Sequence, residues 1–282
     1  MQQHYTNLEP LGNLHKEILI NFRKYMCVGG MPQPVSAYIK NNNFEEVHKI
    51  KDEILNLYRN DVKEQESENS LYLNNIIDSV PSQLSRHGIQ DIKLFRANQA
   101  NPNYRLNDFK GPLNWLQEAM IINIARCCSD PNTALTMTFN ENYFKCYFED
   151  TGLLINLAFK DGTYLNNKFY SAILYDKLHI NEGMFIENII AQELTSNNHT
   201  PTFYAKYNKK GQIESEVDFL IRHQYKIWPI EVRSGKKKAF KSLDKFAQKY
   251  SNKVGKKIVL HEDDLKVNEN TLYLPYYMVG LL

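Results

Sequence analysis

The sequence is poor in cysteine and contains no long apolar run. Its 282 residues include four cysteines, too few for a disulfide scaffold, and no C-x-x-C pair that would indicate zinc, so reduced core thiols are expected. The apolar runs fall far short of the roughly 20 residues that a membrane helix needs. The start, MQQHYTNLEPLG, lacks the basic and apolar regions of a secretory signal. These absences predict a cytoplasmic protein with no membrane partner.

The sequence also lacks a large excess of charge of one sign. Lys plus Arg total 34 against 32 for Asp plus Glu, a net charge of +2, which gives no whole-molecule argument for nucleic-acid binding. With 43% hydrophobic and 23% charged residues, the chain fits neither the disordered nor the fibrous class. Its length predicts more than one compact unit.

The near-neutral total conceals a concentrated basic segment. From Arg233 to Lys257 the chain carries ten basic residues and one acidic residue, Asp244, so this segment has a charge of +9 and the remainder has −7. A lysine run of this kind forms either a solvated helix face or a surface that contacts nucleic acid. The neighbouring residues must decide between the two.

Changes in pattern divide the chain into three predicted units, and together they indicate an α+β or α/β protein. Residues 1–64 contain two amphipathic segments, 14–26 and 44–63, and predict a helical unit with a turn at VGGMPQPV. Residues 65–165 predict a helix interrupted at Pro81, a second helix at GPLNWLQEAMI and two strands, IINIARC and the half-buried NYFKCYFED. Helices followed by a two-stranded ribbon outline a winged-helix-like unit.

The third unit, residues 166–282, has the most legible pattern. GMFIENIIAQELTSN predicts a helix, TFYAKY, EVDFLIR and KIWPIEVR predict three strands, AFKSLDKFAQKYS predicts a helix and KIVLH a strand, giving the order αβββαβ. In the second helix the apolar stripe leaves Lys241, Lys245 and Lys249 four residues apart on another face. Together with Lys236, Lys237 and Lys238, they form a predicted DNA-binding ridge.

Acidic residues in this unit form the candidate site. If EVDFLIR and KIWPIEVR pair through HQYK, Asp218 and Glu231 converge, and two carboxylates with a phosphate oxygen suit Mg²⁺ or Mn²⁺. Glu187 on the preceding helix completes the predicted ligand set. Glu231 and Arg233 lie two residues apart on one strand face, so an ordinary ion pair is the competing interpretation. Gln192 and Glu193 either join the site or form caps or pairs at the surface.

The order of elements and the carboxylates resemble the PD-(D/E)XK nuclease superfamily, here as Asp218 followed by Glu231-Val232-Arg233. Over nearly the whole chain, the sequence also resembles the C-terminal part of a bacterial and archaeal ATP-binding family, in which an AAA+ ATPase precedes a domain of unknown function with a nuclease-like fold. The resemblance is carried by KYMCVGGMPQPV, LYRNDVK, VPSQLSR, PLNWLQEAMII, YFKCYFEDTGLL, IENIIAQEL, SEVDFLI, PIEVRSGKKKAFKSL and LPYYMVGLL. It implies a helical AAA+ lid-like unit at 1–64 and a restriction-endonuclease-like core at 166–282.

Position by position, the resemblance makes Glu187, Asp218 and Glu231 the catalytic carboxylates and metal ligands, and places Arg233 at the motif lysine. Arginine does not deprotonate in proteins, so Arg233 offsets phosphoryl charge but cannot act as a base. Lys206 and Lys236 are alternative sources of an ammonium group.

No Walker-type string G-x-x-x-x-G-K-[ST] occurs, so the chain is expected to have no ATP site and no ATPase activity. Two hypotheses remain open. The first is a metal-dependent nuclease that acts on DNA. The second is a catalytically inactive nuclease-fold module that binds DNA or protein and works with an ATPase partner.

Overall fold

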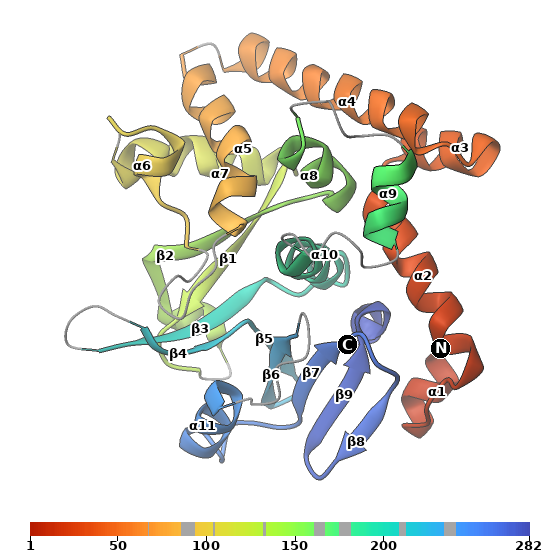
Figure 1. Ribbon diagram of the computed structural model, residues 1–282. Helices are drawn as coiled ribbons and strands as arrows, with labels where there is room; N and C mark the ends of the chain where they lie inside the picture. Colours follow the sequence, from red (N-terminus) through yellow and green to blue (C-terminus); the bar gives the residue numbers. More distant parts are fainter. Residues whose placement is uncertain are drawn as a thin grey trace.

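The chain forms a mixed α and β structure in which N-terminal helices precede two sheets. The computed structural model describes residues 1–66, 68–85, 94–103, 105–131, 134–160, 167–174, 182–208, 213–233 and 241–282. The helices α2 to α5 follow one another along the edge of the molecule in Figure 1, and the sheets lie on the other side of the central helix α10 (Glu182–Ser196). Among the described helices, none has the length and apolar character to cross a membrane.

The N-terminal part consists of four helices, α1 (Gln2–Asn7), α2 (Asn13–Val28), α3 (Pro32–Asn41) and α4 (Phe44–Gln65). The predicted helices over 14–26 and 44–63 are confirmed by α2 and α4. The predicted turn is shorter than expected, because Pro32 begins α3 instead of continuing the turn. Proline is tolerated there since the first amide of a helix has no intrahelical acceptor.

In the middle of the chain, the expected break at Pro81 is wrong. Helix α5 (Ser70–Leu84) runs through this proline, and its buried apolar face packs into the core over four turns. That packing outweighs one missing backbone hydrogen bond. The remaining helical elements here are α6 (Ala97–Ala100), η1 (Leu106–Phe109), α7 (Lys110–Glu118), η2 (Leu135–Thr138), α8 (Thr151–Ala158) and α9 (Asn167–Leu174).

The first sheet has the order β2-β1-β3-β4. Its strands are β1 (Ile122–Cys128), β2 (Phe139–Phe148), β3 (Thr202–Tyr207) and β4 (Ile213–Val217). Strand β1 pairs antiparallel with β2 and parallel with β3, so the predicted two-stranded ribbon is one edge of a larger sheet. A winged-helix unit is therefore not confirmed. The sheet joins strands from both sides of the predicted boundary at residue 165, because the backbone groups along both edges of the buried strand β1 need hydrogen-bond partners.

The second sheet has the order β5-β6-β7-β9-β8. Its strands are β5 (Phe219–His223), β6 (Lys226–Val232), β7 (Lys257–His261), β8 (Lys266–Asn268) and β9 (Thr271–Pro275), followed by η3 (Tyr276–Leu281). The predicted strand EVDFLIR is divided at Asp218, with β4 in one sheet and β5 in the other. The predicted order of helices and strands is otherwise present, with α11 (Lys241–Lys249) before β7. The restriction-endonuclease-like core itself stays a prediction.

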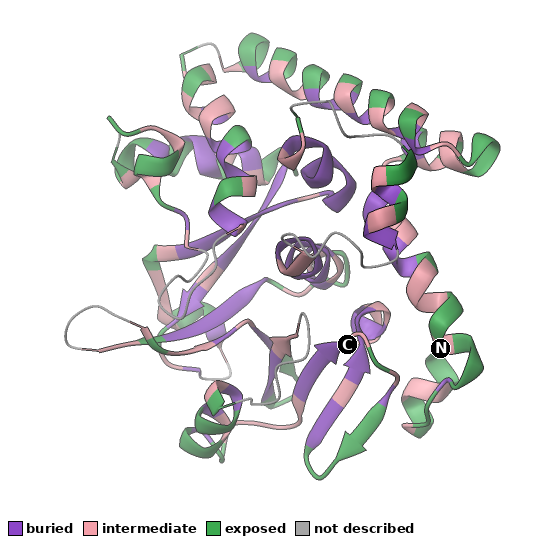
Figure 2. Cartoon of the chain, viewed as in Figure 1, coloured by how far each residue is buried: buried purple, intermediate pink, exposed green. Residues whose placement is uncertain are grey.

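Helix α10 is buried on nearly all sides, as the purple coil at the centre of Figure 2 shows. It packs against β1, β2, α8 and η3. Its polar residues Glu187, Asn188 and Gln192 are buried too. Because buried polar groups need partners, this helix is where long-range polar contacts concentrate.

The backbones of α2 and α8 approach closely at two glycines. A Cβ on Gly152 would lie 2.6 Å from the Gly29 nitrogen and 2.7 Å from the Val28 oxygen. Backbone atoms cannot swing aside, so Gly152→Ala is expected to lower the free energy of unfolding by at least about 2 kcal/mol in urea denaturation. Gly111→Ala on α7 is the matched control, because a Cβ there meets no atom within 4 Å. Equal losses in the two variants would contradict this explanation.

Candidate functional site

Asp218 and Glu231 lie at the open end of a hairpin that the sequence predicts. Strands β5 and β6 pair antiparallel with Phe219 opposite Ile230 and with His223 opposite Lys226, which confirms the hairpin through HQYK. The next position of this register brings together Asp218 and Glu231. An Asp218 Oδ2 atom accepts a hydrogen bond from the Val232 amide at 2.8 Å, so the bend between the sheets is tied to β6.

The carboxylates of this region are close enough to perturb one another. Burial, followed by the charge of Glu187, raises the pKa of Asp218 to about 7. Burial, followed by the charge of Asp218, raises the pKa of Glu231 to about 9. Among the described residues, the buried Oε2 atom of Glu231 has no hydrogen-bond partner. Raised carboxyl pKa values with an unsatisfied oxygen are typical of sites that bind a proton or a cation.

A buried lysine at the centre of this cluster was not predicted from the sequence, and neither was its partner Glu216. Lys145 on β2 is 1% exposed, and its Nζ lies 3.0 Å from Glu187 Oε1 and 2.7 Å from Glu216 Oε1. The hydroxyl of Tyr147 donates to the same Glu187 oxygen at 2.5 Å. The Lys145 ammonium also lowers the pKa of Asp218 and Glu231, against the larger effect of burial. We call Lys145, Glu187, Glu216, Asp218 and Glu231 the acidic cluster.

Strand alternation explains how Lys145 reaches the acidic cluster. Lys145 and Tyr147 lie on one face of β2, and Phe144, Cys146 and Phe148 lie on the other. The expectation of a half-buried strand is wrong for this half of β2, since all residues from Phe144 to Phe148 are buried. A single lysine within this apolar run was the available sequence signal, because lysine is rarely buried without a partner.

The predicted metal-ligand set is only partly free to bind an ion. Within the described ranges, no group of three or more His, Cys, Asp or Glu residues is arranged to hold a metal. Glu187 is engaged by Lys145 and Tyr147, and Glu216 by Lys145. Asp218 and Glu231 fit a divalent cation better, because the unpartnered Glu231 oxygen is a hard donor beside a second carboxylate.

Of the other predicted cations, Arg233 and Lys206 belong to the described residues. The Arg233 amide donates to the Leu260 oxygen at 2.9 Å, and the Arg233 carbonyl accepts from the Tyr276 hydroxyl. Burial raises the pKa of Tyr276, and the Arg233 guanidinium opposes this shift. Lys206, a predicted alternative source of an ammonium group, instead pairs with Glu214 in an exposed contact. Lys236, the other alternative, lies outside the described residues.

Gln192 and Glu193 form pairs on the α2 and α8 side of α10. The Gln192 Oε1 atom accepts from the Thr151 amide at 2.9 Å, and its Nε2 donates to the Tyr25 hydroxyl at 2.8 Å. That hydroxyl donates to Glu193 Oε1 at 3.0 Å. Of the two interpretations that the sequence left open, these contacts agree with pairing.

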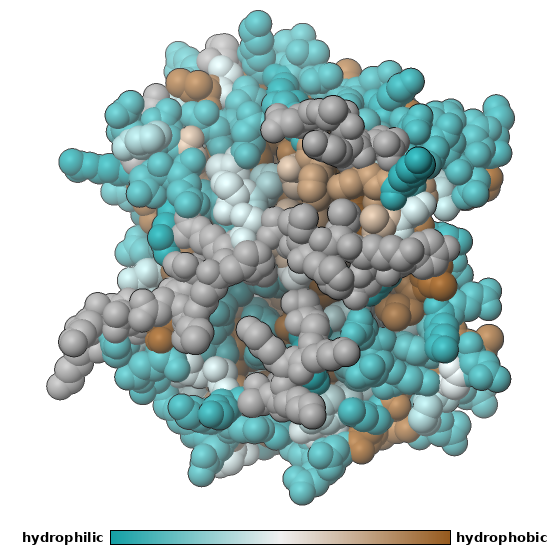
Figure 3. All heavy atoms as spheres, viewed as in Figure 1, coloured by the Kyte–Doolittle hydropathy of each residue, from teal (hydrophilic) through white to brown (hydrophobic). Residues whose placement is uncertain are grey.

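The predicted basic ridge on α11 is present in part. Lys241, Lys245 and Lys249 are all exposed, and the Lys249 Nζ also lies 4.5 Å from the centre of the Tyr250 ring and donates to the Tyr204 hydroxyl. The surface over α11, at the lower left, is teal in Figure 3. Lys236, Lys237 and Lys238 lie outside the described residues. Among the described residues of α11, three cations of the ridge are thus exposed, and one of them, Lys249, also contacts aromatic side chains.

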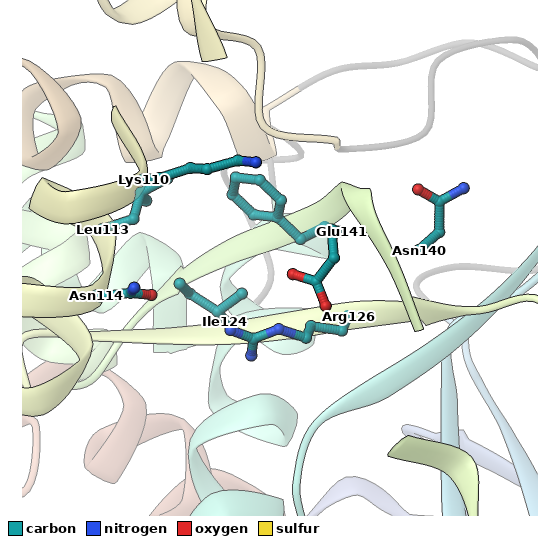
Figure 4. Close-up of a pocket in the computed structure, with 8 residues that line it drawn as sticks. Lys110, Leu113, Asn114, Ile124, Arg126, Asn140 and Glu141 are labelled. Atoms are coloured by element: carbon teal, nitrogen blue, oxygen red, sulfur yellow. The ribbon is translucent and has the colours of Figure 1, made fainter. Parts of the chain in front are cut away.

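A small pocket of about 110 Å³ lies on the opposite face of the β1–β2 pair (Figure 4). Ile124, Arg126 and Phe144 are among its lining residues, together with Lys110 from α7 and Glu141 from β2. Because Phe144 and Lys145 point to opposite faces of β2, this pocket is separate from the acidic cluster.

Comparisons with known proteins give two family matches, both to domains of unknown function. No curated protein and no solved structure matches the chain. Residues 182–278, which hold every carboxylate of the acidic cluster, match a domain of unknown function (DUF4143) that is typical of AAA-ATPase-associated proteins. Lys145 lies outside that match. It falls within residues 19–164, more than half of the chain, which match the model of another domain of unknown function (DUF8612), and the chain therefore belongs to that family.

Proposed function

We propose that the acidic cluster is the site of metal-dependent phosphodiester hydrolysis of DNA. The observation that supports this proposal best is the pair formed by Asp218 and Glu231, in which a buried Glu231 oxygen has no partner among the described residues. Carboxylate pairs of this kind hold Mg²⁺ or Mn²⁺, and such an ion activates water and stabilises phosphoryl charge when bound.

Different residues of this chain would bind the ion, position the carboxylates, supply positive charge and contact DNA. Asp218 and Glu231 would hold the ion, and Glu187 is kept in place by Lys145 and Tyr147. Lys145 supplies the positive charge that the sequence analysis assigned to Arg233. Lys241 and Lys245 on α11 are exposed and would contact the DNA backbone through its phosphates.

The test is a cleavage assay on plasmid and linear DNA with Mg²⁺ or Mn²⁺. Asp218→Asn and Glu231→Gln keep the side-chain shape but remove the ligand charge, so each is expected to reduce cleavage by at least about 100-fold. Glu214→Gln changes an exposed carboxylate on β4 and should cleave at the wild-type rate. Absence of cleavage by the wild-type chain with either metal would reject the proposal.

A second candidate function is an inactive module that binds DNA or protein beside an ATPase. The ion pairs of Lys145 with Glu187 and Glu216 favour it, because they stabilise the acidic cluster without any metal. In that case DNA affinity should fall in Lys241→Glu and Lys245→Glu and be unchanged in Asp218→Asn. Metal-dependent cleavage that is lost in Asp218→Asn would reject this second candidate.

A further inference from the structure

We propose that Lys145 acts as a built-in cation of the acidic cluster, taking the place of one divalent ion beside Glu187 and Glu216. Any divalent ion then binds at Asp218 and Glu231 alone. The identity of that remaining ion rests on the proposed function, whereas the role of Lys145 does not.

The position of the Lys145 ammonium is that of a bridging cation. It lies between two carboxylates that come from different elements, Glu187 on α10 and Glu216 on β4, at 3.0 and 2.7 Å. These are distances of charge-assisted hydrogen bonds. A metal ion that joined α10 to β4 would need the carboxylates of the same two side chains. The lysine therefore competes with such an ion for its ligands.

Lys145 is held firmly in this position. Its side chain is 1% exposed, and its Nζ lies 5.0 Å from the centre of the Phe203 ring on β3. Strand β2 pairs with β1 on one side, and Lys145 itself is opposite Ala125 in that register. Two carboxylate partners and an aromatic neighbour together hold the ammonium in place.

The charge balance of the acidic cluster also depends on Lys145. The acidic cluster contains one cation and four carboxyl groups, and buried like charges are unfavourable unless they are compensated. Lys145 compensates the two carboxylates that it touches. In two-metal sites the ions are about 4 Å apart, and an ammonium at one of these positions repels a second divalent ion from it. Asp218 and Glu231 are left for a single ion.

Lys145 and the four carboxyl groups come from different matched domains. Lys145 lies in residues 19–164, and all four carboxyl groups lie in residues 182–278, so the two matched domains build this cluster together. The C-terminal domain supplies the negative charge, and the N-terminal domain supplies the cation.

The test counts Mn²⁺ ions bound per chain, from the electron paramagnetic resonance signal of free Mn²⁺ during titration of the full chain. Lys145→Gln removes the charge and keeps a polar side chain, and we expect it to bind one more Mn²⁺ than the wild type. Lys206→Gln, which changes an exposed lysine on β3, should match the wild type. The double variant Asp218→Asn with Glu231→Gln gives the number of ions bound elsewhere.

The outcomes separate this inference from the proposed function. One ion in the wild type and two in Lys145→Gln would support both. No ion in the wild type and one in Lys145→Gln would support the role of Lys145 and reject a metal-dependent wild-type enzyme. Equal numbers in the wild type and Lys145→Gln would overturn the inference.

If Lys145→Gln does not fold, as judged by circular dichroism, wild-type crystals grown with Mn²⁺ provide the answer. An anomalous peak within coordination distance of Glu187 and Glu216, with Lys145 displaced, would overturn the inference. No peak at that position, with Lys145 Nζ still on both carboxylates, would support it whether or not Asp218 and Glu231 hold an ion.

Discussion

Lys145→Met is expected to lower the free energy of unfolding by about 3–5 kcal/mol, because it leaves a buried carboxylate without its counter-charge. The side chain of Glu187 is 7% exposed and depends on Lys145 for compensation. Glu216 is 27% exposed at its side chain and can be solvated more easily. Most of the loss should therefore come from Glu187. Urea denaturation at pH 7, in the presence of a chelator, measures it.

A double-mutant cycle tests this cause. If the loss comes from an uncompensated Glu187, then Glu187→Gln in the Lys145→Met background should recover part of the stability, and the coupling free energy should exceed about 1 kcal/mol. Lys206→Met is the matched control, since Lys206 makes an exposed ion pair with Glu214 and such pairs contribute about 0–1 kcal/mol. Strictly additive effects of Lys145 and Glu187 would contradict the explanation.

The parts of this fold that depend on local pattern were predictable. Helices α2, α4, α10 and α11 follow from apolar residues at three- and four-residue spacing, and the β5–β6 hairpin follows from two strand patterns joined by a short turn. The hairpin register then places Asp218 opposite Glu231. Glu187, Asp218 and Glu231 were thus predictable from the sequence, whereas Glu216, the fourth carboxyl group of the acidic cluster, was not predicted.

The position of Lys145 beside these carboxylates was not predictable, because it depends on strand pairing across a long stretch of chain. Strand β1 pairs in parallel with β3, with Arg126 opposite Thr202, and this pairing places β2 and Lys145 near α10. Parallel pairing between distant strands leaves no local periodicity. For the same reason, the ribbon of β1 and β2 resembled a separate unit in the sequence.

The division of the strand at Asp218 was missed for a different reason. The segment EVDFLIR alternates as a continuous strand, yet β4 ends at Val217 and β5 begins at Phe219 in another sheet. Asp218 lies at the change of direction and accepts a hydrogen bond from the Val232 amide. A bend at a buried carboxylate is a tertiary feature. It allows Asp218 to face both Glu187 on α10 and Glu231 on β6.

Glu231→Gln is expected to stabilise the chain at alkaline pH, while it removes a ligand of the proposed ion. The pKa of Glu231 rises from an ordinary 4.5 to about 9, because of burial first and the Asp218 charge second. Between pH 4.5 and about pH 9, Glu231 is protonated in the folded chain and ionised in the unfolded chain. The contribution of this bound proton to the free energy of unfolding is complete below about pH 4.5 and is lost as the pH rises through about 9.

Glutamine has the shape of a protonated glutamate and cannot ionise, so Glu231→Gln avoids this loss. One pKa unit corresponds to 1.36 kcal/mol, and with Lys145 nearby to share the charge we expect the variant to exceed the wild type by on the order of 3 kcal/mol at pH 9. At pH 5 the two proteins should differ by less than about 1 kcal/mol. Urea denaturation with a chelator at both pH values measures the difference.

Glu214→Gln serves as the control, since Glu214 is exposed and its replacement should leave the pH dependence unchanged. A constant difference between Glu231→Gln and the wild type across this range, or a less stable variant at pH 9, would contradict the assignment. The same substitution is expected to abolish cleavage in the proposed enzyme. A residue whose removal stabilises the fold and abolishes the activity is retained for the site and not for packing, and this opposite response separates a functional carboxylate from a structural one.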